Sequence, residues 1–177
     1  MVRIWTVGHS TRTIDVFISL LEKHGIKVLA DVRSLPGSKR YPQFNKETLA
    51  DSLGKAGIRY EHFPELGGRR KPRPDSPNTA WRNESFRGYA DYMETEEFHK
   101  GVKRLLDLAA DAGPTAITCA EAVWWRCHRA LISDYLNARR IEVVHILDAN
   151  KAELHPYTSA AQIVNGKLSY ASENRLL

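Results

Sequence analysis

The chain has 177 residues, of which 42% are hydrophobic and 27% are charged, and its formal net charge is +5. This length and composition predict a single globular domain over residues 1–177 and exclude extensive disorder. Because no apolar run approaches the roughly 20 residues that span a bilayer, and because the N-terminus lacks a signal-peptide core, we expect a cytoplasmic protein whose mature chain begins here.

The first third of the chain alternates β-branched runs with amphipathic segments. Strands are expected at residues 3–8, 27–32 and 58–63. Two helices separate them, the first capped by Ser10 or Thr13 and the second by Asn45, and Gly25 and Gly57 end these helices. The β-α-β-α-β order predicts an α/β fold, a three-layer, Rossmann-like domain with a mostly parallel sheet.

Residues 64–85 contain the pair Gly67-Gly68 and basic residues at 69, 70, 71 and 73, without clean periodicity. A loop of this length inside a compact domain is usually functional, so we expect a basic loop or lid. The span 33–87 holds 12 Lys/Arg and 6 Asp/Glu. This local excess of positive charge favours an anionic partner, although a solubilising surface would show the same composition.

The second half continues the alternation. Helical spacing runs through residues 86–93 and 98–113, and a strand is expected at 115–119. A long helix is expected from about residue 122 to 137, and a fifth strand at 142–147. In the C-terminal extension, 160–177, Asn165-Gly166 separates two short strand-like runs, which predicts a small hairpin.

Polar residues follow four consecutive predicted strands. The carboxyl ends of parallel strands meet at one edge of a sheet, where ligands bind in such folds, so we expect these residues to form one site. The expected catalytic residues are His9, Asp31, Cys119, Glu121 and His128. The expected substrate-binding residues are Ser10, Arg33, Glu65, Gly67, Gly68, Arg69, Cys127 and Arg129.

The chemistry of these side chains suggests their roles. His9 and Glu121 would transfer protons, and Asp31 would orient a partner. Arginines would hold anionic groups, and Cys119, before a helix N-terminus, is a candidate nucleophile. Structural interpretations stay open beside these roles: Asp31 could form a local ion pair with Arg33.

The two cysteines are expected to be free thiols in a reducing compartment. The interval from Cys119 to Arg126 is one residue longer than the Cys-x5-Arg of phosphatases, and the intervening residues are bulky, which argues against a phosphate-wrapping loop. A metal held by Cys119, Cys127 and His128 is conceivable. Adjacent side chains on a helix diverge, however, so no metal and no cofactor is predicted. Cys127 could equally be a small buried hydrophobe, and His128 a core-edge histidine with a satisfied hydrogen bond.

Five ordered motifs resemble the family called domain of unknown function 488. They are Gly8-His9-Ser10, Asp31-Val32-Arg33-Ser34-x-Pro36, Leu66-Gly67-Gly68, Phe86-Arg87-Gly88-Tyr89 and Cys119-Ala-Glu121-x5-Cys127-His128-Arg129. The resemblance extends over residues 3–148. It implies a compact α/β domain in which the motif residues are the functional candidates, and it implies no particular reaction.

The leading hypothesis is an enzyme, a hydrolase or transferase, that acts on a phosphate-bearing substrate such as a nucleotide or nucleic acid. One alternative is a nucleic-acid-binding module without catalysis, in which Trp81 and the basic loop would contact the bases and phosphates. Another is a thiol- or metal-dependent protein centred on Cys119 and Cys127. No membrane partner is expected, and the sequence leaves the oligomeric state open.

Overall fold

A computed structural model describes residues 2–172 of the protein. The strands in this part are β1 (Arg3–Gly8), β2 (Val28–Asp31), β3 (Arg59–His62), β4 (Thr115–Cys119), β5 (Glu142–Asp148), β6 (Lys151–Leu154), β7 (Gln162–Val164) and β8 (Lys167–Ser169). The helices are α1 (Ile14–Lys23), α2 (Lys46–Lys55), α3 (Glu84–Tyr92), α4 (Glu96–Ala112) and α5 (Arg129–Ala138). None of these helices is long and apolar enough to cross a membrane.

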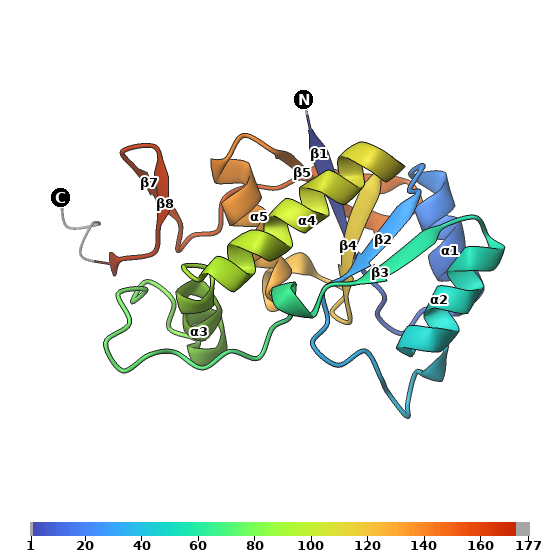
Figure 1. Ribbon diagram of the computed structural model, residues 1–177, viewed down its shortest axis with the longest axis horizontal. Coiled ribbons are helices and arrows are strands. Elements are labelled where there is room, and N and C mark those ends of the chain that lie inside the picture. Colours follow the sequence, from blue (N-terminus) through green and yellow to red (C-terminus); the bar gives the residue numbers. More distant parts are fainter. Residues whose placement is uncertain (1, 173–177) are drawn as a thin grey trace.

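Six strands form one sheet in the order β3-β2-β4-β1-β5-β6 (Figure 1). The first five are parallel, and β6 pairs with β5 in the antiparallel direction. The predicted mixed α/β fold with a mostly parallel sheet is therefore confirmed. The sequence analysis missed β6, because its four residues are all exposed and show no alternation. Charged residues on a short edge strand are typical of natural sheets.

Helices cover both faces of the sheet. One core packs α1 and α2 against one face, and the other packs α4 and α5 against the opposite face (Figure 1). Along β2, Val28 and Ala30 enter one core whereas Leu29 enters the other. Such a strand is apolar on both sides, which explains why the sequence shows continuous runs of hydrophobic residues at β2 and β4.

The predicted helix over residues 122–137 is wrong in its first half. The α-helix begins only at Arg129, after a nine-residue loop that contains a single 3-10 turn, Trp124–Arg126. The loop turns back over the end of β1, where the backbone N–H of Ser10 donates to the Ala120 carbonyl at 2.9 Å. Cys127 has an extended backbone, with φ −139° and ψ 173°. The apolar spacing that suggested an earlier start comes from Trp124, which packs in the core from the 3-10 turn and not from the α-helix.

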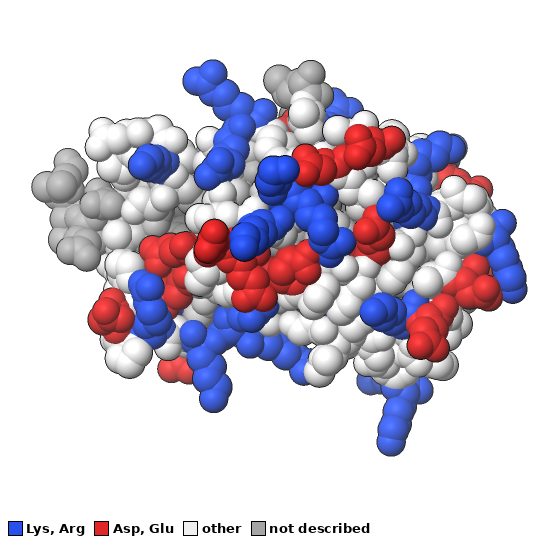
Figure 2. Space-filling view, viewed as in Figure 1, with Lys and Arg blue, Asp and Glu red and all other residues white. Residues whose placement is uncertain are grey.

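The segment 64–85 contains one 3-10 turn, Pro64–Leu66, and is otherwise irregular up to α3. Buried Asp91 of α3 anchors its middle by accepting hydrogen bonds from the Ser76 hydroxyl, the Asn78 amide and the Arg73 backbone. The Arg73 side chain forms an ion pair with Glu94 at 3.0 Å. Figure 2 shows that positive and negative side chains are interspersed on the face it views, so this face carries no patch of a single sign.

The predicted C-terminal hairpin is present as β7 and β8. Asn165 and Gly166 connect the two strands with positive φ angles of 52° and 78°, as a two-residue turn of this type requires. The last residues of the predicted extension, 173–177, lie outside the described residues.

Candidate functional site

A pocket of about 500 Å³ opens where β1, β2 and β4 end. The chain leaves β1 toward the face covered by α1 and leaves β4 toward the face covered by α5. A reversal of this kind leaves a crevice at the sheet edge, which is the usual ligand position in open α/β sheets. The predicted site residues that line the pocket are His9, Arg33, Gly68, Arg69, Cys119, Glu121, Cys127 and His128.

The thiols of Cys119 and Cys127 line the pocket, and the buried guanidinium of Arg129 contacts both sulfurs without lining it. The Sγ atoms of Cys119 and Cys127 lie 2.8 Å apart, and both cysteines are free. The Nε of Arg129 lies 3.1 Å from the Cys119 sulfur and 3.2 Å from the Cys127 sulfur. The backbone N–H of Arg129, at the start of α5, also points at the Cys127 sulfur, at 3.4 Å. The loop between β4 and α5 therefore brings together two residues that are eight positions apart.

Arg129 is buried, with only 1% of its surface exposed. Its other hydrogen bonds go to the Thr6 hydroxyl at 3.2 Å and the Glu121 carbonyl at 2.6 Å, so none of its partners in the described chain is a carboxylate. A guanidinium keeps its proton in proteins, and an uncompensated buried charge costs several kcal/mol. The remaining candidate for the counter-ion is a thiolate.

The surroundings identify Cys127 as that thiolate. Burial by itself would raise the pKa of Cys127, but the hydrogen bond with Cys119 and the positive charge of Arg129 outweigh burial and lower the pKa to about 5. Burial and the neighbouring Cys127 raise the pKa of Cys119 well above its usual value. One proton is thus retained by the pair, on Cys119, and the negative charge resides on Cys127.

This ionisation predicts a pH dependence of stability. The native pKa of Cys127, about 5, lies below the roughly 8.5 of an unfolded thiol, so between these values the unfolded chain binds one more proton than the native one. The free energy of unfolding should then rise with pH by about 1.4 kcal/mol per unit in this window. Urea denaturation of the wild type and of Cys127→Ser at several pH values isolates this contribution. Parallel stability curves for the two proteins would contradict an ionised Cys127.

His9 directly follows β1 and lines the pocket. Its ring stacks on Phe44 at 4.2 Å, its Nδ1–H donates to the Ser10 carbonyl, and its Nε2 faces Arg33 Nη1 at 3.4 Å. Burial is the main cause that lowers the pKa of His9 to about 4, so its ring is neutral near pH 7. Nε2 is then the unprotonated nitrogen and accepts the long hydrogen bond from Arg33 Nη1, so it can take a proton from a ligand that displaces this bond.

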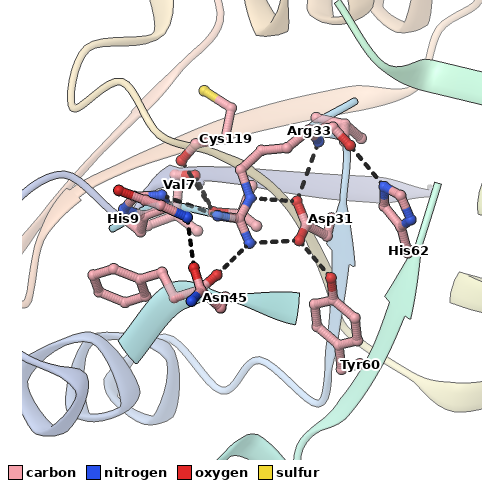
Figure 3. Close-up of polar contacts among 12 residues, drawn as sticks. Val7, His9, Asp31, Arg33, Asn45, Tyr60, His62 and Cys119 are labelled. Carbon is pink, nitrogen blue, oxygen red and sulfur yellow. Dashed lines mark hydrogen bonds and ion pairs between the residues drawn. The ribbon is translucent and has the colours of Figure 1, made fainter. Parts of the chain in front are cut away.

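Asp31 and Arg33 form a two-pronged ion pair, with Arg33 Nε and Nη2 donating to the carboxylate at 2.9 and 2.7 Å (Figure 3). Tyr60 donates its hydroxyl to the same carboxylate at 2.5 Å, and burial together with this carboxylate raises the pKa of Tyr60. Asp31 is fully buried, and only Arg33 reaches the pocket lining. The geometry matches an Asp31 that orients its partner rather than one that contacts a ligand.

His128 and Gly68 meet at the opposite wall. The His128 Nε2–H donates to the Val32 carbonyl at 2.7 Å, and the ring lies 5.1 Å from that of Tyr89. A Cβ added to Gly68 would lie 3.0 Å from His128 Nδ1, so this glycine permits the close approach. Burial lowers the pKa of His128, which keeps the ring neutral. His128 has the satisfied hydrogen bond expected of a core-edge histidine and also faces the pocket.

Three long, charged side chains lie at the pocket mouth. Arg69, Glu121 and Arg126 are exposed there. Arg126 was not among the predicted site residues, although it lies in the same motif. Ser10 adopts a positive φ of 52° beside the pocket and does not line it.

Two further predicted substrate-binding residues, Glu65 and Gly67, do not line this pocket. Glu65 accepts hydrogen bonds from Arg104 at 2.6 Å, on the α4 side of the sheet. Gly67 lies against Ser34, whose Oγ would be 2.5 Å from an added Cβ. The glycines of this turn were expected to let the backbone approach a ligand, and at Gly67 the close approach is to Ser34.

Sequence reasoning missed a set of buried polar residues beneath the thiols: Thr6, Asp134, His145 and His155. A signal was present at His145, because a histidine within an apolar strand needs a polar partner. Within residues 2–172, no group of three or more His, Cys, Asp or Glu side chains is arranged to hold a metal ion.

Together, the fold and pocket define a mixed α/β protein with a paired-thiol and arginine site at the switch point of a mostly parallel sheet. The model of the family described as domain of unknown function DUF488 matches residues 13–136, and the chain belongs to this family. The matched span includes the Cys119–Arg129 motif and ends before His145. No curated protein and no solved structure matches the chain.

Proposed function

We propose that this protein is a thiol-dependent enzyme in which the Cys127 thiolate attacks a small, phosphate-bearing substrate bound in the pocket. The observation that carries the proposal is the buried Arg129, whose guanidinium lies within 3.2 Å of both sulfurs and has no carboxylate partner in the described chain. An activated thiolate beside a pocket is the usual arrangement of cysteine nucleophiles. The proposed nucleophile is Cys127 and not Cys119, the candidate from the sequence, because Cys119 keeps its proton.

The charges around the pocket favour an anionic substrate. Arg33, Arg69 and Arg126 line it, against the single carboxylate of Glu121. Arg33 is held rigidly by Asp31, whereas the exposed Arg69 and Arg126 can move to a ligand. Guanidinium groups are suited to phosphate, and a fixed one contributes orientation as well as attraction.

The chemical step would be a displacement. The Cys127 sulfur forms a bond to an electrophilic atom of the substrate while that atom's bond to the leaving group breaks, and the leaving group departs with the electron pair and takes up a proton. Water or an acceptor hydroxyl then replaces the sulfur and restores the thiolate. His9 Nε2, neutral and unprotonated, would accept the proton of that water or hydroxyl. The leaving group would take its proton from solvent through Glu121, which is exposed at the pocket mouth: the carboxylate takes up a proton from water and passes it on.

We also propose that the chain acts as a single Rossmann-like domain in the cytoplasm. Two sulfurs 2.8 Å apart are easily joined by oxidation, and a reducing compartment would keep them as thiols.

Alkylation tests the nucleophile directly. We expect iodoacetamide to modify Cys127, with a rate that rises with pH to a plateau above about pH 6, because the pKa of Cys127 is about 5. Cys119→Ser should still be labelled at Cys127, whereas Cys127→Ser should be labelled far more slowly, with peptide mass spectrometry locating the adduct. Labelling of Cys119 instead would refute the assignment.

The anionic substrate class is tested with the same reaction. In the wild type, Cys127 should be alkylated faster by iodoacetate than by iodoacetamide. Phosphate monoesters should protect Cys127 from both reagents. The double variant Arg69→Gln, Arg126→Gln should lose this preference. Arg82→Gln, an exposed position in the same basic region but outside the pocket, is the matched control. A preference that survives the double variant would argue against phosphate recognition.

A further inference from the structure

A chain of buried polar side chains leads away from the thiol site into the core. It runs from Arg129 through Thr6 of β1 and His145 of β5 to His155, which follows β6, and ends at Asp134 of α5. All five residues are buried, with Thr6 and Asp134 fully inaccessible. None of the last three residues lines the pocket. The chain therefore has no direct contact with a substrate.

Each link is a short hydrogen bond. Arg129 Nη1 lies 3.2 Å from Thr6 Oγ1, which lies 2.6 Å from His145 Nδ1. His145 Nε2 and His155 Nδ1 are 2.8 Å apart, and His155 Nε2 is 2.8 Å from Asp134 Oδ1. These distances are those of well-formed bonds, apart from the longer first link.

The Arg129 end fixes the direction of the first bond. A guanidinium can only donate, so Thr6 accepts from Arg129. In the arrangement that the relay uses, the Thr6 hydroxyl donates to His145 Nδ1, His145 donates from Nε2 to His155 Nδ1, and His155 donates from Nε2 to the Asp134 carboxylate. Every donor along the chain then has an acceptor.

The surroundings keep the chain in this state. The Trp124 ring stacks on His145 at 4.6 Å with an interplanar angle of 6°, and it packs edge-on against His155 at 4.9 Å. Burial, with smaller contributions from His155 and Arg129, lowers the pKa of His145 to about 2, so this ring is neutral. Asp134 is held by further hydrogen bonds from Thr158 and Tyr170.

We propose that Asp134, His155, His145 and Thr6 form a positioning relay that orients the Arg129 guanidinium against the Cys127 sulfur. The guanidinium is a rigid fork, so fixing Nη1 on Thr6 and Nη2 on the Glu121 carbonyl aims Nε at the sulfurs. His145 accepts the Thr6 hydrogen and thereby leaves the Thr6 lone pairs facing Arg129. Without that acceptor, the hydroxyl hydrogen could rotate toward the guanidinium and repel it.

The relay rests on the proposed function in one respect, that Cys127 is the reactive thiolate. Its test reads the ionisation of Cys127 and needs no substrate. The titratable groups that act on this thiol are Cys119 on β4, the adjacent His128, Arg129 on α5 and Tyr89 on α3. All of them are retained in the variants below.

The experiment is a pH titration of thiolate ultraviolet absorbance, with Cys127→Ser as the baseline that assigns the signal. Thr6→Val keeps the side-chain shape and removes the hydroxyl, and we expect the Cys127 midpoint to rise by about one pH unit. Thr6→Ser restores the hydroxyl and should restore the midpoint. His155→Phe, two links away, should raise the midpoint by a smaller amount.

Ser133→Ala is the matched control. Ser133 is a buried neighbour of Asp134 on α5, and its hydroxyl has no hydrogen-bond partner among residues 2–172, so its removal should leave the midpoint unchanged. Circular dichroism and thermal unfolding establish that each variant is folded.

Two failures are distinguishable. A wild-type midpoint near that of an ordinary thiol would overturn the proposed function, and the relay with it. A low wild-type midpoint that stays the same in folded Thr6→Val or folded His155→Phe would overturn the relay alone.

Discussion

Replacing Arg129 with Met should raise the pKa of Cys127 from about 5 to about 9 or above. The reason is that Arg129 is the nearest cation to this buried thiol, and burial alone favours the neutral form. At about pH 6 the ionised fraction would fall from about nine-tenths to about one-thousandth. Ultraviolet titration of the thiolate measures this change directly.

The titration is a better measure than a single labelling rate. A thiolate of higher pKa is intrinsically more nucleophilic, so its faster reaction would offset part of the loss of ionised thiol. Arg129→Met should still fold, because the variant removes the cation and the thiolate together and leaves no unpaired buried charge. Arg126→Met, on the exposed side of the same loop, is the control. A midpoint near 5 in folded Arg129→Met would show that another group stabilises the thiolate.

Gly8→Ala should destabilise the protein by about 3 kcal/mol or more. A Cβ at Gly8 would collide with the backbone carbonyl of Glu121, which cannot move without shifting the loop that carries Cys127. For a protein of this size, such a loss lowers the melting temperature by about 6 to 12 °C. Thermal unfolding followed by circular dichroism measures it.

The matched control is Gly54→Ala. Gly54 lies in α2 and is exposed, and no atom of the described part of the chain lies within 4 Å of an added Cβ. This change should stabilise the protein slightly, by about 0.5 to 1 kcal/mol, because alanine favours the helix. Equal stability of Gly8→Ala and the wild type would mean that the β4–α5 loop does not pack tightly on β1.

The paired-thiol site also clarifies the basic composition of the middle of the chain. Arg33 forms an ion pair with Asp31, and Arg73 forms one with Glu94. The number of unpaired basic residues in the span 33–87 is therefore smaller than its 12 Lys/Arg suggest. Of the exposed basic residues, Arg69 and Arg126 line the pocket.

Local sequence determined most of the fold. Strands β1 and β4 have the expected bounds, because β-branched runs between turn residues specify buried strands. The turn at Asn165-Gly166 was equally predictable, because few other residues tolerate two positive φ angles in succession. The family membership also followed from the ordered motifs.

The tertiary structure decided what those motifs do. Periodicity placed Cys127 on a helix, where it would diverge from its neighbours, but packing of the loop on Gly8 gives it an extended backbone and brings it to Cys119. The pairing of Arg129 with sulfur rather than with a carboxylate depends on how the loop from Cys119 to Arg129 folds. The relay depends on the order of strands, since Thr6 and His145 meet because β1 and β5 are neighbours. Local propensity carries no information about such long-range contacts, because they are set by the order of strands rather than by any short segment.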